Sequence, residues 1–176
     1  FILTGSNWLD PARLRLYAKI TNTSTTRPLQ LADGPHCTIQ RCRAFLSGTL
    51  IEDVDHYGRN HQMFRRLLTP NDWTVNDAVE SGLQSYKDGA PRSVQPTLSN
   101  KLLAPMVCLT PLLGLMSTGK MLPVRYGGLS LEFTLADAID AVVAGSSTSY
   151  EIQEASIRCA VYSALEASFA QLLMAS

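Results

Sequence analysis

The sequence predicts a mainly β protein, an antiparallel jelly-roll sandwich with two short helices. Apolar and polar residues alternate over residues 13–21 and 129–136, which is the period of a half-buried strand. A Ser47-Gly48 turn separates two further apolar runs and indicates a β-hairpin. About seven strands joined by long connections, with no strand-helix-strand repetition, favour two packed antiparallel sheets over a parallel sheet.

The hairpin and the first helix occupy residues 37–68. We expect strands to about Leu46 and from Leu50 to about Val54, followed directly by a helix from about Asp55 that ends before Thr69-Pro70. The helix is predicted from an apolar stripe spaced every three to four residues. The stripe consists of Tyr57, His61, Phe64, Leu67 and Leu68, with Asp53 and Asp55 at the start as caps and Arg65 and Arg66 at the end.

On the N-terminal side, residues 1–4 form the end of a strand and residues 14–20 a half-buried strand that follows Asp10-Pro11. Residues 22–35 contain Asp33-Gly34 and two prolines, so we expect an exposed connection. The Asn22-Thr23-Ser24 glycosylation sequon is interpreted as a chance match, because the chain shows no secretory feature.

Residues 69–105 are polar and rich in turn residues, which predicts a long connection. Two interpretations remain open for it: a loop that covers a neighbouring subunit, or a flexible insertion.

The C-terminal half is read as strands followed by a helix. Residues 106–116 form a nearly continuous apolar run and predict a buried strand, with an edge or bulge required at Pro111 and Gly114. The strand over 129–136 continues weakly to Val143, and a turn at Gly145 leads to a strand over 150–163. The last segment changes to helical period, with the stripe Leu165, Phe169, Leu172 and Leu173.

Length and composition limit the possible functions. The 176 residues suit one domain, spanning 1–176. Fifteen basic and fifteen acidic residues balance, which argues against a general nucleic-acid binder. No apolar run is long enough to span a membrane. Because the chain opens with Phe1 inside an apolar triplet, we expect it to derive from a longer polypeptide.

The four cysteines, Cys37, Cys42, Cys108 and Cys159, lack the paired spacing of zinc or redox motifs. We therefore interpret them as small buried thiols.

Two motifs imitate catalytic loops. Residues 114–121 match a phosphate-binding loop except that Met121 replaces the hydroxyl residue, and Pro123 argues against the helix that should follow. Ser117 and Lys120 have the spacing of penicillin-recognising serine enzymes, but their partner motifs are missing. We interpret both as features of a turn.

The remaining candidate groups also predict no site. His56 and His61 are five residues apart, whereas two ligands on one helical face need three or four, and His36 is remote in sequence. Glu52, Asp53 and Asp55 form an acidic cluster, of which helix capping explains at least two. We expect no catalytic, cofactor-binding or metal-binding residues and no enzymatic activity.

The order of segments resembles the N-terminal jelly roll of double jelly-roll major capsid proteins of double-stranded DNA viruses. This family includes the capsid proteins of polinton-like viruses, adintoviruses, virophages and nucleocytoplasmic large viruses. The blocks that carry the resemblance are FILTGSNWLDP before RLRLYAKI; FLSGTLIEDVDHYGRNHQMF; and LTPLLGLMSTGKMLPVRYGGLSLEFTLADA followed by YEIQEASIRCAVYSALEASFAQLL. The family carries two rolls in one polypeptide, so the resemblance implies that 1–176 is the first half of a longer chain or a single-roll relative.

The resemblance implies a structural protein that self-assembles as homotrimers into pseudo-hexagonal capsomers of an icosahedral shell. Its partners would be further copies, a second jelly roll, and penton or minor capsid proteins, without specific nucleic acid, and its location would be the virion. The alternative is a lectin-like jelly-roll module that binds a ligand without catalysis, with Trp73 and Tyr86 as the candidate contacts.

Overall fold

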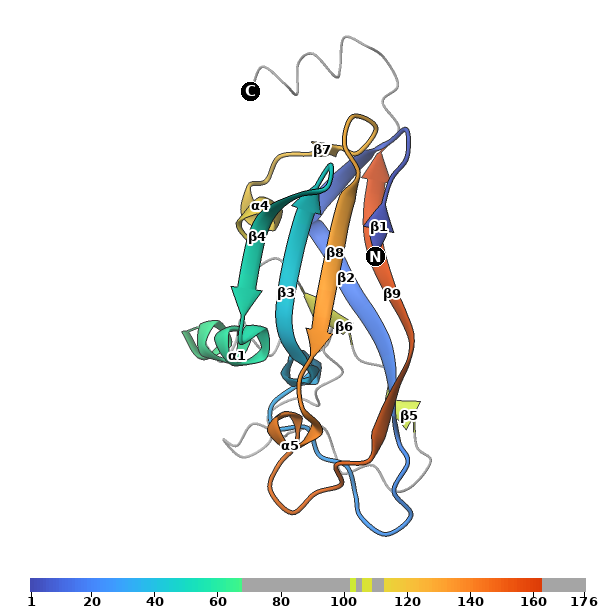
Figure 1. Ribbon diagram of the computed structural model, residues 1–176, viewed down its shortest axis with the longest axis vertical. Helices are drawn as coiled ribbons and strands as arrows, with labels where there is room; N and C mark the ends of the chain where they lie inside the picture. Colours follow the sequence, from blue (N-terminus) through green and yellow to red (C-terminus); the bar gives the residue numbers. More distant parts are fainter. Residues whose placement is uncertain (68–101, 104–105, 109–112, 163–176) are drawn as a thin grey trace.

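The computed structural model describes residues 1–67, 102–103, 106–108 and 113–162. The described part is mainly β and forms a sandwich of two antiparallel sheets, which confirms the predicted fold class (Figure 1). One sheet has four strands in the order β1 (Ile2–Leu3), β8 (Leu129–Leu135), β3 (Ile39–Leu46) and β4 (Thr49–Asp55). The other has five strands: β2 (Trp8–Asn22) pairs with β5 (Leu102–Leu103), β6 (Met106–Cys108), β7 (Leu122–Pro123) and β9 (Tyr150–Tyr162).

The connectivity is that of a long antiparallel ribbon folded over on itself. β2 pairs with β9 in one sheet, and β3 pairs with β8 in the other. The chain passes from β2 to β3, and later from β8 to β9, so each pair continues into the opposite sheet. This nesting is the arrangement of a jelly roll.

The hairpin of β3 and β4 forms because its turn residues tolerate left-handed backbone. Ser47 has φ 50° and Gly48 has φ 83°, as a two-residue turn of the type I′ kind requires. The predicted strand boundaries lie within a few residues of those observed. After β4, His56 also has a positive φ of 50° and turns the chain into helix α1 (Tyr57–Leu67).

The core lies between the sheets. The alternation over residues 14–20 is confirmed, since Leu14, Leu16 and Ile20 are buried on β2. A larger cluster includes Leu14, Leu131 and Met116, and a smaller cluster contains Ile20, Leu29 and Leu31.

Residues 22–35 are the predicted exposed connection only in part, since residues 25–28 are exposed and several later residues are buried. Leu29 and Leu31 are 1% and 0% exposed, and Leu31 forms a β-bridge with Val142. Asn22 is also buried, and its side chain donates to the Arg27 carbonyl and accepts from Ser24 N–H. The connection therefore closes one end of the sandwich, because its two leucines complete the smaller core cluster.

The predicted strand over 106–116 is wrong for its last part. β6 ends at Cys108, and Gly114–Ser117 forms the helical turn α4. Leu113 and Met116, three residues apart, are both 0% exposed. A helical turn directs both side chains to the core, whereas a strand would place them on opposite faces.

The weak continuation of β8 to Val143 is also wrong, because residues 138–141 form α5 (Ala138–Ala141). Its first turn is closed by hydrogen bonds from the Asp140 and Ala141 N–H groups to the Asp137 carbonyl. The expected turn at Gly145 and the expected strand of β9 are both present.

The helix count also differs, since the described residues contain α1, α4, α5 and the short 3₁₀ turn η1 (Pro35–Thr38). The predicted C-terminal helix lies outside the described residues, as does nearly all of the connection over 69–105.

The apolar stripe of α1 is only partly buried. Tyr57 and His61 are 0% and 7% exposed, but Phe64 and Leu67 are 52% and 80% exposed. The N-terminal turn of α1 therefore packs on η1 and β3, while the apolar side chains of its C-terminal half are exposed. The helix ribbon extends outward from the sheets (Figure 1).

Candidate functional site

Polar and titratable side chains gather where η1, α1 and α5 meet at the lower end of β3 (Figure 1). Gly58 permits this meeting, because its position on α1 lies directly against the backbone of η1. A Cβ added at Gly58 would lie 2.6 Å from the His36 carbonyl oxygen and 3.0 Å from the Cys37 Cα. Only glycine allows the two elements to approach so closely.

Asp33 and His36 form a buried acid–imidazole pair. The distance from Asp33 Oδ2 to His36 Nε2 is 2.9 Å, and both side chains are almost fully buried. Burial lowers the pKa of His36, but hydrogen bonds with Asp33 and Cys37, and the charges of these two groups, raise it, and the net shift is upward from 6.5. The pair therefore favours a proton on His36.

His61 of α1 stacks on His36. The ring centroids are 4.3 Å apart and the planes are inclined by 24°. His61 also contacts the Tyr57 ring, with 6.0 Å between centroids. The structure therefore brings together two of the three histidines, which are remote in sequence.

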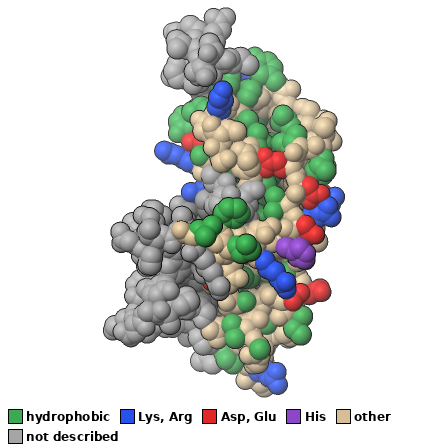
Figure 2. All heavy atoms as spheres, turned by 90° about the vertical axis from the view of Figure 1, so that its left-hand side faces the viewer, with side chains coloured by type: hydrophobic (Ala, Val, Ile, Leu, Met, Phe, Trp, Pro, Cys, Tyr) green, Lys and Arg blue, Asp and Glu red, His purple; other side chains and the backbone are tan. Residues whose placement is uncertain are grey.

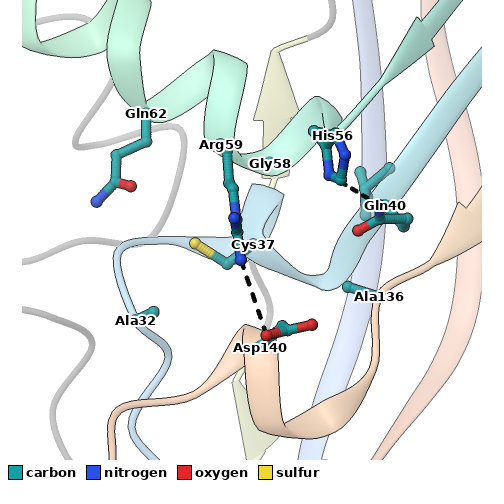
Figure 3. Close-up of a pocket in the computed structure, with 10 residues that line it drawn as sticks. Ala32, Cys37, Gln40, His56, Gly58, Arg59, Gln62, Ala136 and Asp140 are labelled. Atoms are coloured by element: carbon teal, nitrogen blue, oxygen red, sulfur yellow. Dashed lines mark hydrogen bonds and ion pairs between the residues drawn. The ribbon is translucent and has the colours of Figure 1, made fainter.

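A small cavity of about 100 Å³ is lined by residues of η1, α1 and α5 (Figure 3). It is lined by Cys37 from η1, by His56, Arg59 and Gln62 near the start of α1, and by Asp140 from α5. Arg59 pairs with Asp140 at 3.9 Å across the cavity. His56 is exposed and its Nδ1 lies 3.0 Å from Gln40 Nε2.

The cysteines only partly fit the prediction of buried thiols. Cys42 is 0% exposed, while Cys37 and Cys159 are partly exposed. Burial, with a smaller contribution from Glu52 and Asp53, raises the pKa of Cys42 to about 12. Burial also raises the pKa of Cys159. The Cys108 side chain lies outside the described residues.

The acidic cluster does not act as predicted. Only Asp55 lies at the start of α1, where its carboxylate accepts the His56 N–H. Asp53 instead forms a two-bond salt bridge with Arg41 across the hairpin, and the hydrogen bond from Arg41 lowers the pKa of Asp53. Glu52 accepts the Leu115 N–H and so caps α4. The Asp53–Arg41 bridge joins β4 to β3, and the Glu52 contact joins β4 to α4. The local sequence around the acidic cluster does not reveal either partner.

The phosphate-loop imitation does not have the geometry of a phosphate site. Its helical turn α4 begins inside the motif, and β7 rather than a helix follows it. The Ser117 hydroxyl donates to the Gly114 carbonyl, and Gly119 has φ 68°. The segment is a turn, as interpreted from the sequence, and its first four residues form the helical turn α4. Trp73 and Tyr86 lie outside the described residues.

A second cavity of about 280 Å³ lies between the sheets. Its lining is almost entirely apolar and includes Leu16, Ile152, Phe133 and Leu135. Such a lining suits an apolar group rather than a sugar, which needs convergent polar contacts.

Apolar side chains are exposed on the C-terminal half of α1 (Figure 2). This apolar flank comprises Met63, Phe64 and Leu67, with exposures from 52% to 80%. β4 is an edge strand among the described residues. Such a cluster of exposed apolar side chains is typical of a contact surface.

Within residues 1–67, 102–103, 106–108 and 113–162, no group of three His, Cys, Asp or Glu side chains is placed to hold a metal ion. In the same part of the chain, no helix has the length and apolar character needed to cross a membrane. The sequence matches no protein-family model, and no curated protein is significantly similar to it.

Proposed function

We propose that this chain is a structural subunit of a viral capsid, one jelly roll of a major capsid protein that forms pseudo-hexagonal trimers. It acts without catalysis, in the virion, and its partners are further copies, a second jelly roll, and penton or minor capsid proteins. The observation that supports this most is the nested pairing of β2 with β9 and of β3 with β8. That pairing agrees with the fold implied by the sequence resemblance.

A rigid two-sheet sandwich suits this role, because its core lies between the sheets and its outer surfaces remain available for contacts. The apolar flank supplies one such surface, since Met63, Phe64 and Leu67 project from the sandwich. The zero net charge avoids long-range repulsion between copies.

Analytical ultracentrifugation of the full chain over a range of concentrations tests the proposal. We expect trimers or larger assemblies, or a species that exposes enough apolar surface to bind a hydrophobic dye strongly. A protein that remains monomeric at every concentration and does not bind the dye would contradict it.

The double substitution Met63→Glu, Phe64→Glu tests whether the apolar flank makes the contacts. Both side chains are more than half exposed, so the fold should tolerate the change while assembly is lost. Arg59→Glu is the matched control on the same helix, and it should assemble as the wild type does. Assembly that persists in the double variant would exclude the flank as the contact surface.

The lectin-like alternative makes a different prediction. Ligand that binds only the folded state raises the Tm, so a concentration-dependent shift with simple sugars would favour a binding module over a capsid subunit.

A further inference from the structure

The second cavity, of about 280 Å³, borders both core clusters. Leu16 and Ile39 belong to the larger cluster and Ile20 belongs to the smaller one, and all three line the cavity. The lining also comes from both sheets, since Leu16 and Ile20 lie on β2, Ile39 on β3 and Phe133 on β8. The cavity therefore lies inside the sandwich, where the two clusters meet.

A β-bulge in β9 and two small residues leave this space open. Ile152 and Ala155 are three positions apart and would face opposite sides of a regular strand, but both line the cavity. Between them, Glu154 has φ 50°, and the register of β9 against β2 shifts on either side of Ala18. Ala18 and Ala155 both end at Cβ, so neither side chain fills the space between the sheets.

The lining passes from the buried core to the solvent. Leu16 and Ile20 are 8% and 1% exposed, whereas Phe1 and Leu135 are 43% and 58% exposed. A ligand can therefore enter the cavity from the exposed side and keep a polar end in water.

The chemistry of the lining limits the class of ligand. Thr38 is the only polar side chain among the described residues that line the cavity, and its hydroxyl donates to the Pro35 carbonyl at 2.7 Å. A charged or sugar group would thus lose its hydration without gaining a side-chain partner. An apolar cavity of about 150 Å³ in another protein binds benzene. The larger volume here suits one longer hydrocarbon group.

We propose that the cavity between the sheets is a binding site for one medium-length alkyl chain, whose head group stays in water beside Leu135. Binding buries the chain against residues of both sheets and fills the space where the two core clusters meet. The site is distinct from the apolar flank and does not depend on the capsid role.

Straight-chain alcohols from 1-butanol to 1-octanol, added to the full chain, are the probes, and isothermal titration calorimetry gives the stoichiometry and the Kd. We expect one molecule of 1-octanol per chain, and an affinity that rises about fourfold for each methylene group that enters the cavity. The absence of saturable 1-octanol binding, or an affinity that does not depend on chain length, would overturn the proposal.

Octanoate tests the position of the head group. It carries a charged head group on a chain like that of 1-octanol, and it should also bind, because its carboxylate stays in water. Binding of the alcohol without binding of octanoate would contradict the exposed position of the head group.

Two cavity-filling variants test the location of the site. Ala18→Leu and Ala155→Leu each add an isopropyl group to the lining, so each should weaken 1-octanol binding at least about tenfold. Ala160→Leu is the matched control, because it makes the same change on β9 outside the lining and should leave the Kd unchanged.

The thermal stability of the variants separates filling from unfolding. Ala18→Leu fills an existing space, so its Tm should equal or exceed that of the wild type. If it does not fold, Ala155→Leu decides the question, because Ala155 is exposed and tolerates a larger side chain. An unchanged Kd in Ala155→Leu would refute this cavity as the site.

Discussion

Gly58 is the residue at which α1 comes closest to η1. The surrounding atoms are backbone, the His36 carbonyl oxygen and the Cys37 Cα, and backbone cannot move aside as a flexible side chain can. The first turn of α1 and the cavity beside Cys37 both depend on this contact.

We expect Gly58→Ala to lower the free energy of unfolding by about 1–3 kcal/mol, because the added methyl group forces α1 away from η1. Urea denaturation measures the change. The adjacent control Arg59→Ala removes a side chain that is 75% exposed and should change stability by less than about 0.5 kcal/mol. Equal effects of the two substitutions would show that the contact is looser than described.

The Asp33–His36 pair makes stability depend on pH. Although burial lowers the pKa of His36, hydrogen bonds and charge from Asp33 and Cys37 raise it above its ordinary value of 6.5, so the folded state holds this proton more tightly than the unfolded chain does. This contribution is fully present below pH 6.5 and is lost as the pH rises through the raised pKa.

Asp33→Asn removes the negative charge but keeps a polar group of similar size. Burial then dominates the pKa of His36 and lowers it. The stability of the wild type should fall as the pH rises above 6.5, and the stability of the variant should not. Urea denaturation at pH values on either side of 6.5 gives both profiles. His56→Gln is the control, because His56 is exposed and its loss should leave the fall in place. An unchanged profile in Asp33→Asn would rule out this pair as the cause.

The sequence predicts little of the candidate site. His36 and His61 are separated by a whole hairpin, and no local period indicates that their rings stack. For Asp33 the sequence predicts only a turn with Gly34, because its pairing with His36 depends on how residues 22–35 pack. The Asp-x-x-His-Cys order is visible in the sequence, but only burial distinguishes it from an ordinary loop.

At the scale of elements, α4 shows how a distant strand stabilises a short helix. A four-residue helical turn cannot stabilise itself, because nucleation fixes several residues for one hydrogen bond. The Glu52 carboxylate of β4 accepts the Leu115 N–H and supplies the cap from outside the segment.

Glu52→Ala should therefore lower the free energy of unfolding by about 1 kcal/mol, the usual cost of a lost cap. Glu52→Gln keeps a carbonyl acceptor and should lose less. Asp53→Asn tests the next residue, whose exposed bridge to Arg41 contributes little and is weakened further by salt. Thermal unfolding ranks the three variants, and the expected order fails if Asp53→Asn is the most damaging.

Long strands with strict alternation could be predicted from the sequence, and short elements could not. β2 buries Leu14, Leu16 and Ile20 against the core, so its apolar residues repeat every second position. β9 is covered less completely, and Ile157 and Cys159 are only partly buried against the core. α4 and α5 each contain four residues, which is about one helical turn. One turn is too short for the helical spacing of apolar residues to be told apart from the alternation of a strand. The first turn of α1 was predicted correctly, but its stripe did not reveal that Phe64 and Leu67 remain exposed.

At the scale of the whole molecule, stability depends on the core between the sheets. Leu131 and Leu135 lie on the same strand and the same face of β8, but they are 1% and 58% exposed. The first half of β8 is therefore buried in the core, and its C-terminal end is exposed.

Leu131→Ala should cost about 2–5 kcal/mol, because it leaves a cavity that the two sheets cannot close. Leu135→Ala removes the same atoms from a half-exposed site and should cost less than about 1 kcal/mol. Denaturant midpoints measured in parallel test this contrast. Similar losses would mean that another part of the chain covers Leu135.

The pairing of β2 with β9 has a kinetic consequence. Trp8 lies opposite Tyr162, so β2 receives its most extensive partner only when residues 150–162 have been made. Closing so large a loop precedes any gain from the contacts, and proteins dominated by such distant pairings fold in milliseconds to seconds. During synthesis, the hairpin of β3 and β4 can form as soon as both strands have been made, while the inner face of β2 stays uncovered until β9 is available.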